Sequence, residues 1–335
     1  MTNKKTKYNK WLLVGLLSVV IGAPNGTIIK STLGEINSTT FTFLKLAMMA
    51  VVFLPAVIAF MLRHWKVIKK NAFNLTVSII GTVVSLITFY KAIEYSAASY
   101  ASIISLLSPI VLVVMSSKLI KEKVGPRAVA GITLAAIGGL LVVAVPAIFQ
   151  GSAASVFYPL ATVLVLINCV SSPLSVIYQR KANDNGVSFS VYAGLSAMAT
   201  AIVALVMSWI ESGPSEIAVQ TANLSLWGWI GIIYSAFAVS FASRSLWIVA
   251  YQRTGSTVSG GLSYLETMMA IALPIMLLGE KLSLELVSGA LLILLGIYVA
   301  ESRPRRNKSK TRRKKGGRPR QAVRTHNLQN RHQLR

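Results

Sequence analysis

The chain of 335 residues offers little material for several common kinds of active site. It has a single cysteine, Cys169, so no intramolecular disulfide can form, and cysteine usage says nothing about an oxidising compartment. Its three histidines lie outside the long apolar runs, which leaves little for a metal site or a histidine-dependent hydrolase. No stretch matches the phosphate-binding pattern G-x-x-x-x-G-K-S/T, so direct use of ATP is not expected. We therefore predict no metal site and no enzymatic activity.

Charged residues are also scarce, and those present are mostly positive. Asp, Glu, Lys and Arg make up 13% of the chain, against about 25% in a typical soluble domain, while 54% of the residues are hydrophobic. The 34 Lys and Arg residues outnumber the 10 Asp and Glu residues, and 14 of the basic residues follow Glu301. This composition argues against a water-soluble globule and is typical of a membrane protein.

Long apolar runs dominate the part of the chain before Glu301. A helix needs about 20 mostly apolar residues to cross the hydrocarbon core of a bilayer. The predicted spans are residues 11–29, 39–62, 75–93, 99–119, 128–148, 155–178, 188–210, 226–251, 257–278 and 283–300. Because lipid offers the backbone no hydrogen-bond partners, these spans must be helices. We predict an all-α polytopic membrane protein with ten transmembrane helices, the first of them uncleaved.

The positions of Lys and Arg between the spans predict the orientation. If residues 1–10 are a cytoplasmic N-terminus, 29 of the 34 basic residues fall in cytoplasmic segments and three in outer segments. The positive-inside rule then places both termini in the cytoplasm. We expect a multi-pass protein of the plasma membrane.

The two halves of the chain resemble each other at a constant offset of 158 residues. The matched pairs are Ala92 and Ala250, Ser105 and Ser263, Leu107 and Leu265, Glu122 and Glu280, Lys123 and Lys281, Gly131 and Gly289, and Gly138 and Gly296. The repeats would be residues 11–148 and 155–301, with five helices each. Because five is odd, the second repeat must enter the membrane in the opposite orientation. Inverted repeats of this kind occur in secondary transporters, which bind substrate between the repeats near the midplane.

Several short motifs in both repeats carry a family resemblance. They are Ser108-Pro109, Glu122-Lys123 and Gly131 in the first repeat, and Leu265-Glu266, Gly279-Glu280-Lys281-Leu282-Ser283, Gly289-Ala290 and Gly296-Ile297-Tyr298 in the second. The chain resembles the drug/metabolite transporter superfamily, EamA type, over about residues 11–301. The resemblance implies a ten-helix carrier, commonly an exporter of amino acids or other small metabolites, without a cofactor. Many members have arginine where Lys45 stands.

Three charged residues fall inside the predicted spans, where charges are costly and mark candidate sites. Lys45 lies close enough to the outer face to snorkel to it or to form a structural pair. Arg244 and Glu266 lie deeper. Either they form a buried ion pair that fixes helix packing, or they bind substrate.

Further candidates share a helix face with these charges or interrupt a span. Ser240, Arg244, Trp247 and Tyr251 recur at helical spacing, as do Ser259, Ser263 and Glu266. The aromatic candidates for solute contact, which packing alone would also explain, are Tyr90, Tyr100, Trp247 and Tyr264. Asn168, ahead of Ser171-Ser172-Pro173, predicts a broken or hydrated stretch in the sixth span, and Asn25, after Pro24, predicts one in the first. For Glu122 and Glu280, at span ends beside lysines, we expect solvated loop or helix-end roles.

The segment 302–335 is strongly basic and has few apolar residues, so we predict a disordered cytoplasmic tail that contacts anionic lipid. Its motif Gly317-Arg318-Pro319-Arg320 is too short a match to predict nucleic-acid binding. The leading interpretation is a secondary transporter of a small metabolite, such as an amino acid or a cationic organic solute, that works by alternating access without ATP. The alternative is a non-transporting scaffold or sensor whose basic tail binds lipid or nucleic acid. A homodimer is left open.

Overall fold

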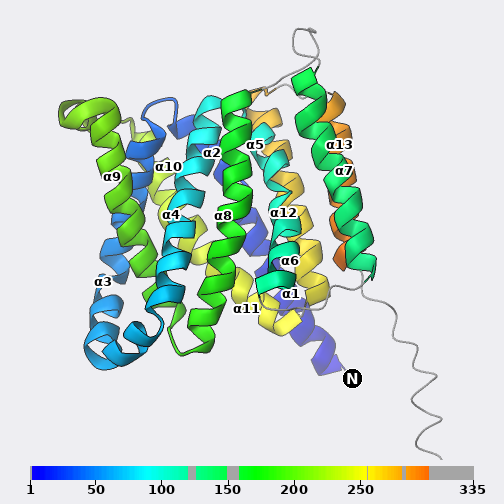
Figure 1. Ribbon diagram of the computed structural model, residues 1–335, viewed down its shortest axis with the longest axis horizontal. Helices are drawn as coiled ribbons and strands as arrows, with labels where there is room; N and C mark the ends of the chain where they lie inside the picture. Colours follow the sequence, from blue (N-terminus) through cyan, green and yellow to red (C-terminus); the bar gives the residue numbers. More distant parts are fainter. Residues whose placement is uncertain (1, 120–125, 149–157, 255, 281–283, 302–335) are drawn as a thin grey trace, which may run out of the picture. The chain divides into compact units, whose positions relative to one another are not determined.

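The computed structural model describes residues 2–119, 126–148, 158–254, 256–280 and 284–301, which form helices joined by short connections (Figure 1). The predicted tail, with Glu122, Lys123 and Lys281, lies outside these described residues. The helices are α1 (Thr2–Gly22), α2 (Asn25–Thr32), α3 (Ser38–Lys70), α4 (Ala72–Tyr95), α5 (Ala98–Ser105), α6 (Ser108–Leu119), α7 (Pro126–Ile148), α8 (Pro159–Asp184), α9 (Phe189–Ala222), α10 (Leu226–Ile233), the π-helix η1 (Tyr234–Ser243), α11 (Arg244–Thr254), α12 (Ser256–Leu278) and α13 (Leu284–Glu301).

The helical segments agree with most of the predicted spans. Seven are long and apolar enough to cross a membrane: Lys10–Thr32, Ser38–Lys70, Ala72–Tyr95, Ala98–Leu119, Pro159–Asp184, Phe189–Ala222 and Leu226–Trp247. Three shorter apolar helices, Val129–Val142, Leu265–Leu278 and Leu286–Val299, fall within the other predicted spans. The all-helical membrane fold is therefore confirmed, whereas the exact number of ten spans stays a prediction.

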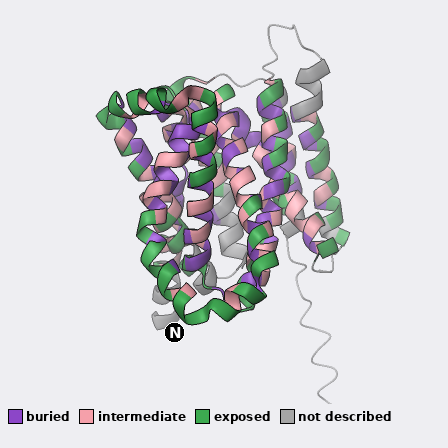
Figure 2. Ribbon diagram, turned by 60° about the vertical axis from the view of Figure 1, so that its left-hand side comes forward, coloured by how far each residue is buried: buried purple, intermediate pink, exposed green. Residues whose placement is uncertain are grey.

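Buried and exposed side chains are distributed as a lipid environment requires. Buried residues lie between the helices, and many exposed residues cover their outward faces (Figure 2). The most exposed large side chains are themselves apolar, with Leu62, Ile210 and Leu284 all at least 80% exposed. In water such a surface would aggregate, whereas in a bilayer it contacts hydrocarbon.

The main helix contacts join the first half of the chain to the second. α3 packs on α9, α7 on α13 and α5 on α12, and each of these pairs joins spans that correspond in the two repeats. The contacts α4–α8 and α1–α11 are likewise equivalent when the halves are exchanged. An approximate two-fold relation between the repeats produces this pattern, so the fold fits the predicted pair of repeats.

Two of the predicted spans are interrupted in the middle. The first is broken at Ala23 and Pro24, between α1 and α2, as expected next to Asn25. Proline has no N–H and cannot continue the backbone hydrogen bonds of α1. Next to the break, the carbonyl of Ile21 accepts from Tyr234 Oη at 2.5 Å. The fourth span is broken between α5 and α6.

The predicted break near Asn168 is wrong, because α8 continues through Pro173. A proline within a membrane helix removes one backbone donor, and nearby hydroxyl groups can satisfy the backbone around it. In the turn before Pro173, Ser171 Oγ donates to Ile167 O at 2.8 Å.

Candidate functional site

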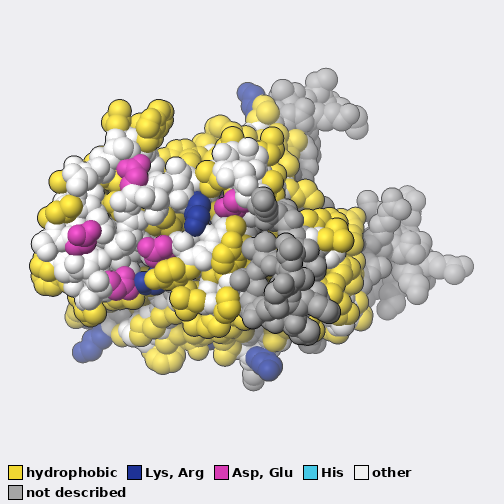
Figure 3. All heavy atoms as spheres, turned by 90° about the horizontal axis from the view of Figure 1, so that it is seen from above, with side chains coloured by type: hydrophobic (Ala, Val, Ile, Leu, Met, Phe, Trp, Pro, Cys, Tyr) yellow, Lys and Arg dark blue, Asp and Glu magenta, His cyan; other side chains and the backbone are white. Residues whose placement is uncertain are grey.

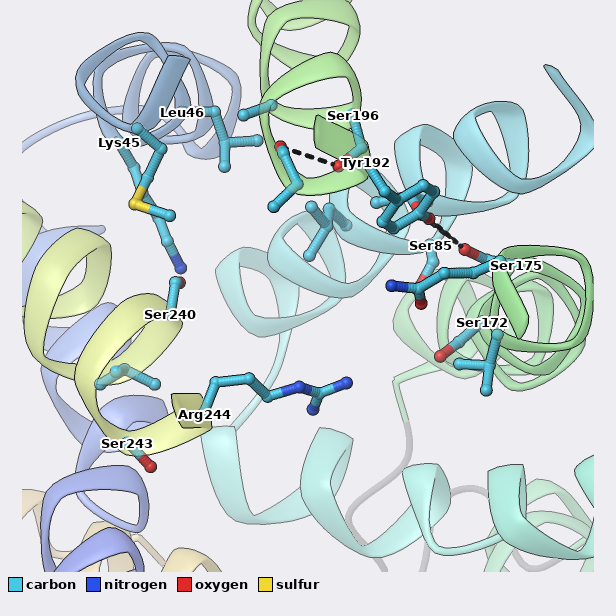
Figure 4. A pocket seen from close by; sticks show the side chains of 18 of the residues that line it. Lys45, Leu46, Ser85, Ser172, Ser175, Tyr192, Ser196, Ser240, Ser243 and Arg244 are labelled. Carbon is cyan, nitrogen blue, oxygen red and sulfur yellow. Dashed lines mark hydrogen bonds between the residues drawn. The ribbon is translucent and has the colours of Figure 1, made fainter. Parts of the chain in front are cut away.

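A cavity of about 680 Å³ lies between the two halves of the bundle. Its walls come from α1, α2, α3, α4, α8, α9, η1, α11 and α12, and Figure 4 shows side chains from several of these helices turned into it. The ionisable and large aromatic residues on its walls are Lys45, Tyr90, Phe189, Tyr192, Arg244, Trp247 and Glu266. A space of this volume suits a small organic solute.

Lys45 lies on the cavity wall rather than at the end of its helix. The side chain is buried, and Nζ donates to Tyr90 Oη at 2.7 Å and lies 5.1 Å from the centre of that ring. Tyr90 is held in turn by an edge contact with Phe41 at 5.5 Å between ring centres. Figure 4 shows the amino group pointing toward the interior. Snorkelling of Lys45 to the outer face, which the sequence suggested, is therefore wrong in this conformation.

Arg244 and Glu266 both reach the cavity. Arg244 is the first residue of α11 and extends into the open space (Figure 4). Glu266, on α12, lies against Gly22 at the end of α1, where a Cβ would overlap its carboxylate. No ion pair joins Arg244 to Glu266. The ion pair that the described part of the chain does contain is Lys91–Glu211, at 2.6 Å, and neither of these residues lines the cavity. The buried ion pair weighed from the sequence is therefore absent from this conformation.

The π-helix η1 immediately precedes Arg244. Its wide turns appear in the backbone bond from Arg244 N to Val239 O, five residues back. Ser240 Oγ also donates to Ser235 O at 2.9 Å. π-helical segments are rare and often occur at functional sites. Ser240 of this segment lines the cavity together with Arg244 and Trp247, as the helical spacing predicted, and Ser243 lines it as well. The side chains of Tyr251, Ser259 and Ser263 lie outside the described part of the chain.

Two of the remaining candidates line the cavity and two pack away from it. Tyr90 and Asn25 are on the wall, and Asn25 Oδ1 accepts from Ser235 Oγ at 3.0 Å. Tyr100 is buried outside the cavity, with its Oη 2.7 Å from Thr162 Oγ1, so its role is packing between α5 and α8. Asn168 also lies off the wall.

Asn168 joins α8 to α4 instead. Its Nδ2 donates to Ser85 O at 2.9 Å and to Ser85 Oγ at 2.7 Å. Ser85 itself lines the cavity, so Asn168 acts on the wall through its neighbour. The side chain of Tyr264 lies outside the described residues.

A group of four hydroxyls at the cavity wall was missed by the sequence reasoning. Three of them, on Thr82, Ser175 and Tyr192, line the cavity, and that of Ser78 is buried behind them. Tyr192 Oη lies 2.9 Å from Ser78 Oγ, 2.6 Å from Thr82 Oγ1 and 2.9 Å from Ser175 Oγ. The four residues come from α4, α8 and α9, and Figure 4 shows Tyr192 and Ser175 across the cavity from Lys45. Single hydroxyl residues are common in membrane helices, so no local spacing marked them.

One end of the bundle, here the capped end, holds the end of α4 and the beginning of α5. Glu280 accepts from Ala98 N at 2.8 Å, from Ser99 N at 2.9 Å and from Ser99 Oγ at 2.6 Å. Its carboxylate therefore caps α5, where the helix dipole favours a negative charge. Glu280 therefore has a helix-end role, as a cap on α5, rather than a solvated loop role.

Other carboxylates at the capped end make equivalent contacts. Glu94 accepts from Ser38 Oγ at 2.6 Å at the start of α3, and Glu35 accepts from Ser225 N and Oγ, both at 2.8 Å, at the start of α10. Lys30 donates to two carbonyls at the end of α4. Figure 3, a view of this end, shows acidic and basic side chains close together. These contacts tie the helices to one another across the capped end.

The chain matches the model of the EamA-like transporter family over residues 9–144 and 159–301. It belongs to this family. EamA-like proteins are multi-pass membrane transporters, and the two matched segments are the two repeats. The chain is also similar to a protein of known crystal structure at 20% sequence identity, covering 88% of this chain and 96% of that chain with a TM-score of 0.55. At this identity the likeness supports the fold alone. No curated protein matches the chain.

Proposed function

We propose that this EamA-like protein is a secondary transporter that exports a small metabolite by alternating access, without ATP. The observation that carries the proposal is the cavity between the repeats, whose walls hold Lys45, Arg244 and Glu266 at bilayer depth. Charges at that depth are costly, and a path for a polar solute accounts for them. Amino acids and cationic organic solutes are the two solute classes to compare.

The extent of the cavity supports an inward-facing state. Phe189, the first residue of α9, lines it, so it reaches the end of the bundle where α8 ends and α9 begins. We call this the open end. At the other side it stops at Tyr90, about one turn before the end of α4 at the capped end. If the positive-inside rule holds, the open end is cytoplasmic.

Flux in proteoliposomes tests the function directly. Purified protein should exchange labelled solute for unlabelled solute in counterflow without ATP, and protein-free vesicles should not. A broad panel of amino acids and organic amines that gives no flux in either direction would refute transport.

The orientation makes a separate prediction. Single cysteines at Lys69 and Ser215 in a Cys169→Ser background lie at the open and capped ends respectively, and both side chains are exposed. We expect an impermeant maleimide added to intact cells to label Ser215→Cys and not Lys69→Cys, which should react only after the cells are opened. Labelling of both from one side would contradict the topology.

The capped end must open for solute to leave on that side, and Glu280 is the carboxylate with the most contacts there. Glu280→Gln keeps the side-chain size but weakens the charge-assisted bonds to α5, each worth about 1.5–3 kcal/mol. We expect a cysteine at Ser240, in the cavity, to react several-fold faster from outside in this variant than in its parent. Glu216→Gln, an exposed glutamate of α9 at the same end, is the matched control. Equal rates in the two variants would mean that Glu280 does not hold this end closed.

The scaffold alternative makes the tail the working part of the protein. Deletion of residues 302–335 should then abolish function. For a transporter we expect the truncated protein to retain flux per molecule once it is inserted. Loss of flux with normal membrane abundance would favour the alternative.

A further inference from the structure

The end of the cavity nearest the capped end, here the deep end, holds the ammonium group of Lys45, which has no carboxylate beside it in the described part of the chain. Lys45 is 2% exposed, and no carboxylate of the described residues lies within ion-pair distance of it. The bond to Tyr90 Oη supplies a neutral partner only. A buried ammonium without a counter-ion is unfavourable, so this position favours the arrival of an anion.

The Lys45–Tyr90 pair presents two donors to the same space. Because Tyr90 Oη accepts from Lys45, its own hydroxyl hydrogen remains available, and no acceptor for it is found among the described residues. Lys45 Nζ has further hydrogens beyond the one given to Tyr90. An ammonium and a phenol hydroxyl held 2.7 Å apart match the two oxygens of one carboxylate.

The break in the first span adds positive character to the same cavity. Asn25, the first residue of α2, is on the wall, and the first turn of a helix carries unpaired N–H groups and a partial positive charge. In the same turn Thr27 Oγ1 is buried without a partner among the described residues. Broken helices of transporters direct their N-termini at anionic groups in this way.

The remaining charged residues on the cavity wall also favour a solute with an anionic group over an organic cation. Arg244 adds a second cation, and Glu266 is the single carboxylate. An organic cation would meet two like charges and a helix N-terminus. A carboxylic acid would meet favourable groups at the deep end and could still place one ammonium near Glu266.

We propose that the transported solute is a small carboxylic acid, with or without an amino group, that binds with its carboxylate against Lys45, Tyr90 and the first turn of α2. Organic cations that lack a carboxylate are excluded from the site. This inference rests on the proposed transport function and decides between its two solute classes.

Two series of compounds, each on one carbon skeleton, test the assignment. Isovalerate, valine and isobutylamine form the first, and hydrocinnamate, phenylalanine and phenethylamine the second. Each is assayed for direct flux and for competition in proteoliposomes. We expect acids and amino acids of at least one series to be carried and the matching amine to be at least tenfold weaker. A carried amine that equals its acid would overturn the proposal.

Substitutions of Lys45 and Tyr90 test whether these two residues cause the preference for carboxylic acids. Lys45→Gln should weaken binding of acid and amino acid at least tenfold, and Lys45→Arg should recover much of it because guanidinium also binds carboxylate. Tyr90→Phe, which keeps the ring and removes the hydroxyl, should weaken both several-fold. Lys66→Gln, the same change at an exposed lysine of α3, is the control and should leave binding unchanged. Unchanged acid binding in folded Lys45→Gln and Tyr90→Phe would overturn the assignment.

Failure of this inference can be told apart from failure of transport. Flux of other solutes, with none of these acids or amino acids carried, overturns the carboxylate assignment and leaves transport standing. Absence of flux for every solute in the broad panel overturns transport itself, and the inference with it.

Discussion

Glu266→Gln is expected to insert and fold like the wild type and to lose transport about tenfold to a hundredfold. The estimate corresponds to one lost interaction with a charged group, about 1.5–3 kcal/mol, at about 1.4 kcal/mol for each factor of ten. Glu266 faces the cavity and forms no ion pair with Arg244 in the described conformation. Removal of the Glu266 charge therefore leaves no buried cation without its counter-ion. The loss of transport should come from weaker binding of the solute or of a proton.

The double substitution separates this role from a structural one. Arg244→Gln alone should also fold and lose flux, and Glu266→Gln/Arg244→Gln should stay inactive. A structural pair predicts the opposite, namely low abundance of each single variant and recovery of both abundance and flux in the double. Asp184→Asn, at an exposed acid at the end of α8, controls for loss of one negative charge. The measurement is flux per folded transporter in proteoliposomes, and recovered flux in the double variant would refute the site assignment.

The fold was predictable because it depends on properties that the sequence displays directly. Apolar runs of span length must form helices in lipid, whatever their neighbours are. The internal repeat was visible because matched residues, such as Glu122 and Glu280, recur at one constant offset along the chain. Pro24 also marked the break next to Asn25, where the carbonyl of Ile21 accepts from Tyr234 Oη.

The site was only partly predictable because depth in the membrane does not determine which way a helix face turns. Tyr90 and Tyr100 both lie in predicted spans, yet one lines the cavity and the other packs against Thr162. Rotation of each helix follows from contacts with helices distant in the sequence. Tyr192 and Ser175 were missed for the same reason, since their hydroxyls meet only once α8 and α9 are packed.

The capping role of Glu280 shows a second limit. Hydropathy places Glu280 at the end of a span, beside a lysine. A glutamate in this position is expected to be solvated or to lie at the end of its own helix. The helix that it caps begins at Ala98, which is 182 residues away in the chain. Only the packing of α12 against α5 brings the two together. A cap supplied by another repeat has no local sequence signature.

The closest helix packing in the bundle explains why the repeats share their glycines. α7 and α13 lie side by side at one edge of the bundle (Figure 1). A Cβ on Gly138 would lie 2.7 Å from Gly289 O, and one on Gly296 would lie 2.5 Å from both Ala135 N and Gly131 O. These are contacts with backbone atoms, which cannot rotate away. Small residues allow membrane helices to approach in this way, where no hydrophobic effect drives them together.

Gly296→Ala is therefore expected to destabilise the protein even though alanine favours a helix over glycine by about 1 kcal/mol. The added methyl group must push α13 away from α7, and overpacking of this kind costs about 1–3 kcal/mol or more. Gly138→Ala, the equivalent change in the first repeat, should behave alike. Gly26→Ala is the matched control, because its Cβ would meet nothing closer than 3.9 Å.

The measurement is the melting temperature and folded yield of the detergent-solubilised protein. We expect both to fall for Gly138→Ala and Gly296→Ala and to hold or rise for Gly26→Ala. Leucine at Gly296 should lower the folded yield further, since its side chain has no space between the two backbones. Equal melting temperatures for Gly296→Ala and Gly26→Ala would contradict the close approach of α7 and α13, and with it the packing reason for the repeated glycines.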